Sequence, residues 1–391
     1  MSTTAPTDPQ AFRHHVREVL AQMAVRRDEL GAVPAYVPRA DGVAFQKRLT
    51  AAGLVGLSVP TRYGGAGLGR DHVEIFNEEA AEYWLPSMLF SVTIGMCVPV
   101  LLEFGTEEQK LRHVPPMLRG DEIWCQMFSE PGAGSDLASL QLRAVSDGDG
   151  WVLDGQKVWT SAAHYADVAM CAARTDQDIA RHGGISMFML PLDTPGVEVR
   201  PLRLMTGQSA FNEVFCTDVR IPADHLIGAV GDGWRCVSAM LMNERVALGA
   251  SSSPLVSGLA IEASERAQRA GRNDDPVERD GLAQLAVEER VLEFVASSVR
   301  TRARAGNTPG PEGSIAKLMG SELVRSAAAV NSSVAGLDAQ AWSHDDDEAA
   351  ALARGILHAP SLSIAGGTSE IQRNIIGERV LGLPREPHPG P

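Results

Sequence analysis

The sequence predicts an α+β protein of three parts, helical at both ends with a compact β domain between them. Apolar residues recur at helical spacing in the first and last thirds, whereas short apolar runs separated by Gly, Pro and Asp fill the middle. At 391 residues the chain is well above the size of a single hydrophobic core. We therefore expect an N-terminal helical domain at 1–120, a middle β domain at 121–232 and a C-terminal helical domain at 233–391.

The first part carries a helical stripe and a helix-start signal. The apolar residues of the stripe are Phe12, Val16, Val19, Leu20 and Met23. Thr106 and Gln109 have the spacing of a capping box, which predicts a helix that begins there. The glycine-rich run at 60–69 lacks the Lys-Ser/Thr of a phosphate loop and the strand–turn–helix context of a dinucleotide site, so we interpret it as a structural turn.

In the middle part, Asp154-Gly155 stands between Trp151-Val-Leu153 and Gln156-Lys-Val-Trp159. Asp-Gly suits a tight hairpin turn, so this pattern predicts two short strands joined at Asp154-Gly155. Further strands are expected at 185–190, 197–202 and 214–219.

Helical patterns return after Gly233. One apolar stripe runs through Asn243-Glu244-Arg245, a second helix is expected around 282–292, and an Ala-rich helix at 315–330. A loop is expected at 308–313. The Pro-rich end at 384–391 cannot propagate a helix and is expected to fray.

Composition narrows the class of protein. The formal net charge of −14 argues against a general binder of nucleic acid, although a local basic pocket for an anion stays possible. The five cysteines are scattered without CxxC spacing. The sequence contains neither an HExxH motif nor a Cys/His cluster, so we do not expect a metal site. No secretory signal is visible, and the apolar stretch 86–102 is interrupted by polar residues and Pro, which favours a buried helix over a membrane span. We expect a cytoplasmic protein that is not in a membrane.

Three segments carry the chemistry. Ser129-Glu-Pro-Gly-Ala-Gly-Ser-Asp136 is a loop whose glycines let a planar or phosphorylated ligand approach the backbone. Trp159-Thr-Ser161 offers an aromatic plane and hydroxyls, and a third segment reads Ser363-Ile-Ala-Gly-Gly-Thr-Ser-Glu-Ile-Gln-Arg373. Together they resemble the signature of the acyl-CoA dehydrogenase family, and the resemblance runs from the helical start to Leu383. It implies that family's fold, with a β-barrel-like middle domain and a C-terminal four-helix bundle.

The resemblance also implies FAD as cofactor and acyl-CoA as substrate, and it assigns residues by their place in the motifs. Ser135 would line the acyl-CoA path as well as the cofactor, and Gly366, Gly367 and Arg245 would contact substrate. Arg272 has the spacing of an Arg that pairs with the FAD pyrophosphate of a neighbouring subunit. The full set of implied cofactor contacts is Phe128, Ser129, Gly134, Ser135, Trp159, Ser161, Arg272, Thr368 and Glu370.

The catalytic base requires a separate argument. Many members of this family carry Glu-Gly-Thr, whose Glu removes the α-proton of the thioester, but Gly366 stands at that position here. In one branch of the family, including isovaleryl-type members, the base lies on a helix directly before an Arg, as Glu244-Arg245 does here. The alternative is that Glu244 is a surface acid paired with Arg245. The carboxylate before Arg245 and the absence of a carboxylate at position 366 both match this branch. We therefore expect Glu244 to be the base.

The expected reaction is therefore FAD-dependent α,β-dehydrogenation of an acyl thioester, as part of fatty acid or lipid metabolism. The resemblance implies electron-transferring flavoprotein as electron acceptor and a homo-oligomer, a dimer or tetramer. A non-catalytic or partner-dependent subunit of a hetero-oligomeric dehydrogenase is a second interpretation, since Gly366 lacks the carboxylate. Acyl groups held by a carrier protein, or oxidation with O₂, are further alternatives.

Overall fold

The computed structural model describes residues 5–30, 37–86, 88–179, 181–248, 256–304, 310–340 and 346–385. Contacts divide the chain into two compact units at Asn243 and Glu244. Residues 1–243 are called unit 1 and residues 244–391 unit 2, and each is described by itself. The three domains expected from the sequence differ from this division, and their boundaries stay a prediction.

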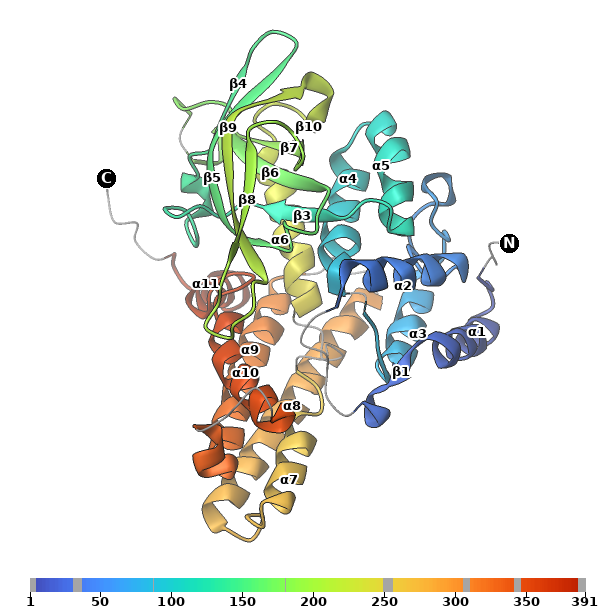
Figure 1. Cartoon of the computed structure of the whole chain (residues 1–391), viewed down its shortest axis with the longest axis vertical. Coiled ribbons are helices and arrows are strands. Elements are labelled where there is room, and N and C mark those ends of the chain that lie inside the picture. Colours follow the sequence, from blue (N-terminus) through green and yellow to red (C-terminus); the bar gives the residue numbers. More distant parts are fainter. Residues whose placement is uncertain are drawn as a thin grey trace. The chain divides into compact units, whose positions relative to one another are not determined.

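Unit 1 joins helices to a large sheet (Figure 1). Its helices before the sheet are α1 (Pro9–Met23), α2 (Arg39–Ala51), α3 (Arg70–Ala80), α4 (Val98–Phe104) and α5 (Glu107–Arg119). Two short strands, β1 (Val25–Arg26) and β2 (Tyr83–Trp84), pair antiparallel among these helices. The predicted stripe is confirmed, because Phe12, Val16 and Leu20 are fully buried. The predicted capping box is also confirmed: Thr106 and Gln109 exchange both hydrogen bonds at the start of α5.

The sheet of unit 1 has eight strands in the order β10-β7-β6-β4-β5-β9-β8, with β3 pairing with β6. The strands are β3 (Trp124–Met127), β4 (Arg143–Ser146), β5 (Gly150–Ser161), β6 (Val168–Arg174), β7 (Ile185–Pro191), β8 (Val197–Leu202), β9 (Phe211–Pro222) and β10 (Leu226–Ile227). All residues of β6 are buried. Such an apolar run is typical of a strand that is covered on both faces.

The sheet curls around one of its faces. The rings of Trp151 on β5 and Phe188 on β7 lie 5.2 Å apart, although two strands separate β5 from β7 in the sheet. In a flat sheet, neighbouring strands are about 4.8 Å apart, so these rings would lie about 14 Å from each other. The curvature agrees with the barrel-like middle domain that the resemblance implies.

The Asp154-Gly155 turn expected from the sequence is wrong. Residues 150–161 form the single strand β5, and the register against β9 shifts between Leu153 and Gly155. Gly155 has a φ of +143°, and a Cβ added there would lie 2.9 Å from the Cα of Leu142. Asp-Gly therefore marks a β-bulge where two backbones approach closely, which has the same sequence signal as a tight turn.

Helices α4, α5 and the first half of α6 (Gly233–Leu248) pack on the other face of the sheet. From α6, Cys236, Val237 and Met240 enter this core, and all three are fully inaccessible to solvent. The predicted helix through Asn243-Glu244-Arg245 is confirmed. Its buried first half anchors the helix in unit 1, and Glu244 is the first residue of unit 2.

Unit 2 is helical, and its central helix is α9 (Glu312–Ala335). Helices α7 (Leu259–Arg269), α8 (Pro276–Arg304), α10 (Asp347–Leu362) and α11 (Ser369–Ile375) all contact α9. The helices expected around 282–292 and 315–330 are confirmed. The loop expected at 308–313 is wrong at its end, because α9 already begins at Glu312. Residues 386–391 of the expected frayed tail lie outside the described residues.

Two general expectations are also addressed by the fold. None of the described helices is both long and apolar enough to cross a bilayer. All five cysteines are buried and unpaired, as expected from their scatter. Burial raises the pKa of the Cys171 thiol to about 11, so at neutral pH this thiol stays protonated.

Replacing Gly155 with Ala is expected to destabilise the protein by about 2 kcal/mol or more, because the new methyl meets Leu142 and the residue keeps a positive φ. The free energy of unfolding in urea measures the effect. Gly132→Ala is the matched control, since a Cβ there meets nothing within 4 Å. Equal stability of the two variants would contradict the bulge.

Candidate active site

The loop that follows β3 lies against β5 in unit 1. Phe128 is buried, and the backbone N–H of Val158 donates to the carbonyl oxygen of Ser129 at 2.9 Å. This bond places Ser129 beside the end of β5 that carries Trp159 and Ser161. The structure therefore brings together four of the residues expected to contact the cofactor.

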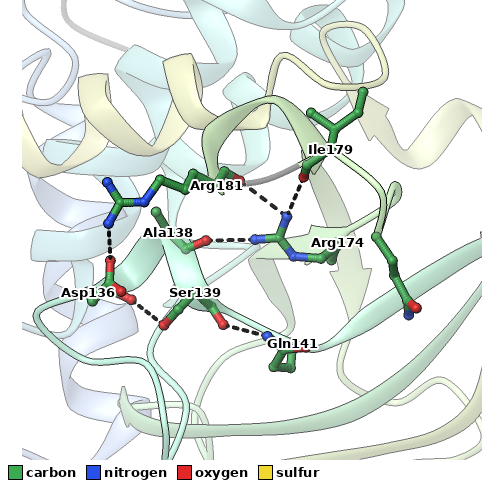
Figure 2. A pocket seen from close by; sticks show the side chains of 8 residues that line it. Asp136, Ala138, Ser139, Gln141, Arg174, Ile179 and Arg181 are labelled. Atoms are coloured by element: carbon green, nitrogen blue, oxygen red, sulfur yellow. Dashed lines mark hydrogen bonds and ion pairs between the residues drawn. The ribbon is translucent and has the colours of Figure 1, made fainter. Parts of the chain in front are cut away.

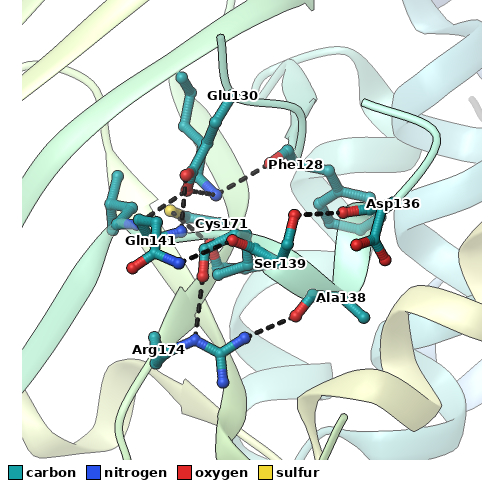
Figure 3. Close-up of polar contacts among 12 residues, drawn as sticks. Phe128, Glu130, Asp136, Ala138, Ser139, Gln141, Cys171 and Arg174 are labelled. Carbon is teal, nitrogen blue, oxygen red and sulfur yellow. Dashed lines mark hydrogen bonds and ion pairs between the residues drawn. The ribbon is translucent and has the colours of Figure 1, made fainter. Parts of the chain in front are cut away.

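A buried ion pair fixes this loop (Figure 3). The Lys157 ammonium, fully inaccessible to solvent, lies 2.8 Å from the Glu130 carboxylate and donates to the Phe128 carbonyl oxygen at 2.8 Å. Glu130 also accepts from the backbone N–H groups of Gln141 at 2.6 Å and Leu142 at 2.8 Å. The pair thus joins both ends of the loop 128–142 to β5.

Trp159 is held in an unusual backbone conformation. Its φ is +62°, and the register of β5 against β9 shifts between Lys157 and Thr160. The indole is 58% exposed and meets the Phe211 ring edge-on at 5.9 Å. A bulge re-aims a side chain out of the sheet, and here it presents a large aromatic plane to solvent. The strand ends at Ser161.

Gly134 and Ser135 lie exposed in the same loop. The next residue along the chain, Asp136, lines a pocket (Figure 2). The pocket has a volume of about 400 Å³ and is lined by Asp136, Ser139, Arg174 and Arg181, among others. The buried Arg174 guanidinium donates to the carbonyl oxygens of Ala138 at 2.7 Å and Leu140 at 2.9 Å. It also donates to the carbonyl oxygen of Arg181 at 3.2 Å, so it joins the 138–140 segment to the loop between β6 and β7.

A tight turn at Gly366-Gly367 precedes α11 in unit 2. Both glycines have positive φ, +66° and +91°. The Gln372 side-chain amide donates to the carbonyl oxygens of Gly366 at 3.0 Å and Gly367 at 3.1 Å, and the Lys317 ammonium donates to Gly367 at 2.8 Å. Thr368 caps α11 by accepting from the backbone N–H of Ile371 at 3.3 Å.

Glu244 lies half-buried on α6. Burial lowers the pKa of Lys317, and the negative charges of Glu244, Glu370 and Glu322 act in the opposite direction. Lys317 therefore lies within electrostatic range of Glu244 and bonds the Gly366-Gly367 turn at the same time. Arg245 follows on the same helix, but its side chain lies outside the described residues.

The remaining expected cofactor contacts lie near the surface of unit 2. Glu370 is largely exposed, and a hydrogen bond from its own backbone N–H, with a second from the Thr368 hydroxyl, holds its pKa below the usual range. Arg272 is 2.8 Å from the buried Glu278 carboxylate and donates to the carbonyl oxygen of Val334 at 3.2 Å. Their roles toward a cofactor stay predictions.

Sequence reasoning missed four residues that shape the site. Glu130 and Gln372 stand inside recognised motifs, Lys157 lies between Gln156 and Val158, and Lys317 is a single cation in an apolar run. A lysine flanked by apolar residues in a predicted core segment is itself a signal, because a buried ammonium requires specific partners.

Models of the acyl-CoA dehydrogenase N-terminal, middle and C-terminal domains match residues 6–121, 125–219 and 231–381. The chain belongs to the acyl-CoA dehydrogenase family.

Three similar proteins illustrate this membership. The acyl-CoA dehydrogenase IpdE1 of Mycobacterium tuberculosis is 40% identical over 346 residues, which are 88% of each chain. The solved ChsE4-ChsE5 complex from Mycobacterium tuberculosis contains a chain that is 31% identical, with a TM-score of 0.80, covering 99% of this chain and 100% of that one. The Tcur3481-Tcur3483 steroid ACAD is 26% identical, with a TM-score of 0.82, covering 97% and 99%.

Acyl-CoA dehydrogenases are FAD-dependent oxidoreductases, and the residues present fit that cofactor. The exposed Trp159 offers a flat face to a ring system. At Gly134 an added Cβ would meet nothing within 4 Å, so the loop admits close approach. Five buried polar side-chain atoms of the described residues have no partner, and Thr160 Oγ1, Ser369 Oγ and Gln372 Oε1 are three of them. Buried polar atoms of this kind are normally satisfied, so these three are available to a bound group.

Lys157→Met in this acyl-CoA dehydrogenase is expected to destabilise the fold by about 3–5 kcal/mol, because it leaves the Glu130 carboxylate buried without its cation. Urea unfolding of the protein measures this loss, and its flavin content reports whether the loop still forms. The double variant Lys157→Met/Glu130→Gln is expected to recover part of the stability.

The matched control is Lys47→Met, which breaks an exposed ion pair with Asp121. Exposed pairs contribute about 0–1 kcal/mol. If the Lys157 and Lys47 variants lost equal stability, the buried pair would not be what holds the loop.

Proposed function

We propose that this acyl-CoA dehydrogenase removes the α-proton of its thioester with Glu244. The observation that carries the proposal is the position of Lys317, which bonds the Gly366-Gly367 turn and interacts electrostatically with Glu244. This interaction supports a carboxylate in the neighbourhood of the turn, which is the position where other members carry their base. Gly366 itself, with a left-handed φ, supplies no carboxylate.

The chemistry requires proton removal at Cα together with hydride removal at Cβ. Bound FAD supplies the hydride acceptor. Backbone N–H groups of the Gly366-Gly367 turn are suited to polarise the thioester carbonyl, which stabilises the negative charge that develops as the proton leaves. Glu244 is half-buried, so water competes less for the proton that it holds. A trans-2-enoyl thioester is the product.

For the substrate, we propose a bulky, ring-bearing acyl-CoA. Glycine at 366 places no side chain beside the α-carbon, and this frees volume next to the reacting centre. One solved relative is named a steroid ACAD, which supports a polycyclic acyl group. Acyl groups on a carrier protein are the alternative, because the thioester end is the same in both.

A second candidate is partner-dependent function. Two solved relatives are named as pairs of proteins, ChsE4-ChsE5 and Tcur3481-Tcur3483. This favours a hetero-oligomer over the homo-oligomer expected from the sequence. In either assembly we propose electron-transferring flavoprotein as the electron acceptor. Flavin content and molar mass of the chain purified alone, by light scattering, distinguish the two: a colourless protein requires a partner.

Glu244→Gln is expected to slow anaerobic flavin reduction at least about 100-fold while FAD stays bound, because the amide cannot accept the α-proton. Stopped-flow absorbance of the flavin, with straight-chain, branched and polycyclic acyl-CoAs, measures this rate. The same panel identifies the acyl class.

The control for this variant is Glu293→Gln, which removes an exposed carboxylate on α8. It is expected to reduce at the wild-type rate. A Glu244→Gln enzyme as fast as this control would exclude Glu244 as the base, and reduction by straight-chain thioesters alone would exclude the proposed substrate class.

A further inference from the structure

Two buried side chains from different helices hold the carbonyl oxygens of one turn. Lys317 reaches the turn from α9 and Gln372 from α11, and together they bond Gly366 and Gly367. Lys317 is 3% exposed and Gln372 is fully buried. The turn is therefore fixed from the protein side.

Fixing these carbonyls also fixes the neighbouring N–H groups. Within a trans peptide unit, the C=O and the N–H of the next residue point in opposite directions. Since the oxygens of Gly366 and Gly367 face Lys317 and Gln372, the N–H groups of Gly367 and Thr368 point away from them. The N–H groups of Gly366, Gly367 and Thr368 donate no hydrogen bond to another described residue. Successive free N–H groups at positive φ form a concavity that binds an electronegative atom.

Burying the Lys317 ammonium is unfavourable unless a hydrogen bond offsets the loss of hydration. Burial penalises the ammonium form and lowers its pKa, and no carboxylate of the described residues lies within 4.0 Å of it. Methionine would fill similar space without this penalty. The ammonium of Lys317 is accounted for by its hydrogen bond to the Gly367 carbonyl oxygen.

Two side-chain atoms of α11, the helix that follows the turn, make no hydrogen bond within the described residues. Gln372 Oε1 and Ser369 Oγ are buried without a partner among the described residues. Both side chains are more than nine-tenths buried. Both residues lie in α11, which begins directly after Gly366, Gly367 and Thr368.

We propose that Lys317 and Gln372 are positioning residues, which hold the Gly366-Gly367 turn so that its free N–H groups donate to the thioester carbonyl oxygen. This inference rests on the proposed function, and it names the side chains that orient the groups polarising the thioester carbonyl. Neither side chain touches the reacting atoms; both act through the turn.

The test compares FAD-loaded wild type with Lys317→Met, Gln372→Met and the double variant, with Lys47→Met as exposed control. The first readout is the absorption band of bound 4-(dimethylamino)cinnamoyl-CoA, which shifts to longer wavelength when its carbonyl is polarised. The second is the rate of anaerobic flavin reduction by the acyl-CoA that reduces the wild type fastest. Flavin content and melting temperature report folding.

We expect each single variant to keep FAD and to lose most of the red shift of the bound chromophore. Flavin reduction should be about 10- to 100-fold slower, whereas the dissociation constant of the chromophoric acyl-CoA should stay within about threefold of the wild-type value. Because both side chains act through one turn, the double variant should be little slower than the slower single variant. A lower melting temperature with an unchanged band and rate would overturn the proposal, since this is the result of a purely structural role.

Two outcomes need separate treatment. If Lys317→Met fails to fold, Gln372→Met decides by the same criteria. If no thioester reduces the wild-type flavin, the proposed function fails. The absorption band of the bound chromophore then tests the positioning role by itself. A red shift in wild type that both variants lose supports the positioning role, and a wild type without a red shift overturns it.

Discussion

The contact between Lys157 and Glu130 is the interaction on which the β half of the site depends. A carboxylate and an ammonium are both removed from water, and each is satisfied by the other and by backbone groups of one loop. Such pairs contribute little net stability relative to apolar residues, but they are very sensitive to loss of one partner. The pair specifies one conformation of the loop 128–142, and this fixes Ser129 beside Trp159.

Unit 2 also contains a buried lysine that holds a loop through its backbone. Lys317, like Lys157, is a buried ammonium that donates to a backbone carbonyl oxygen in a loop with functional residues. Loops lack the regular hydrogen bonds of helices and strands, so their peptide planes rotate unless a side chain holds them. The ammonium of a buried lysine has three hydrogen-bond donors, and one bond to a carbonyl oxygen restricts the rotation of that peptide plane. In each unit, a loop that carries expected site residues is therefore held by a buried cation bonded to its backbone.

The sequence predicted those features that local chemistry determines. Helical spacing located α1 and α9, and the capping box at Thr106 located the start of α5, because side chains three or four residues apart decide them. The Asp154-Gly155 turn was misjudged, since the same dipeptide suits a bulge where Leu142 approaches, and only the tertiary contact distinguishes the two. Lys157, Glu130 and Lys317 have partners that are distant in sequence, so spacing could not reveal their roles. Family motifs located Gly366 and include Gln372, but they did not reveal that Gln372 holds the turn.

The exposed indole of Trp159 has a consequence for the newly made chain. Before cofactor loading, its bulged strand keeps a large apolar face in water, and such faces favour association with other molecules. A flavin ring that covers the indole would bind the folded state and not the unfolded one, which shifts the folding equilibrium by mass action. Supply of riboflavin to the host cell then becomes a determinant of how much folded protein accumulates, independently of any turnover.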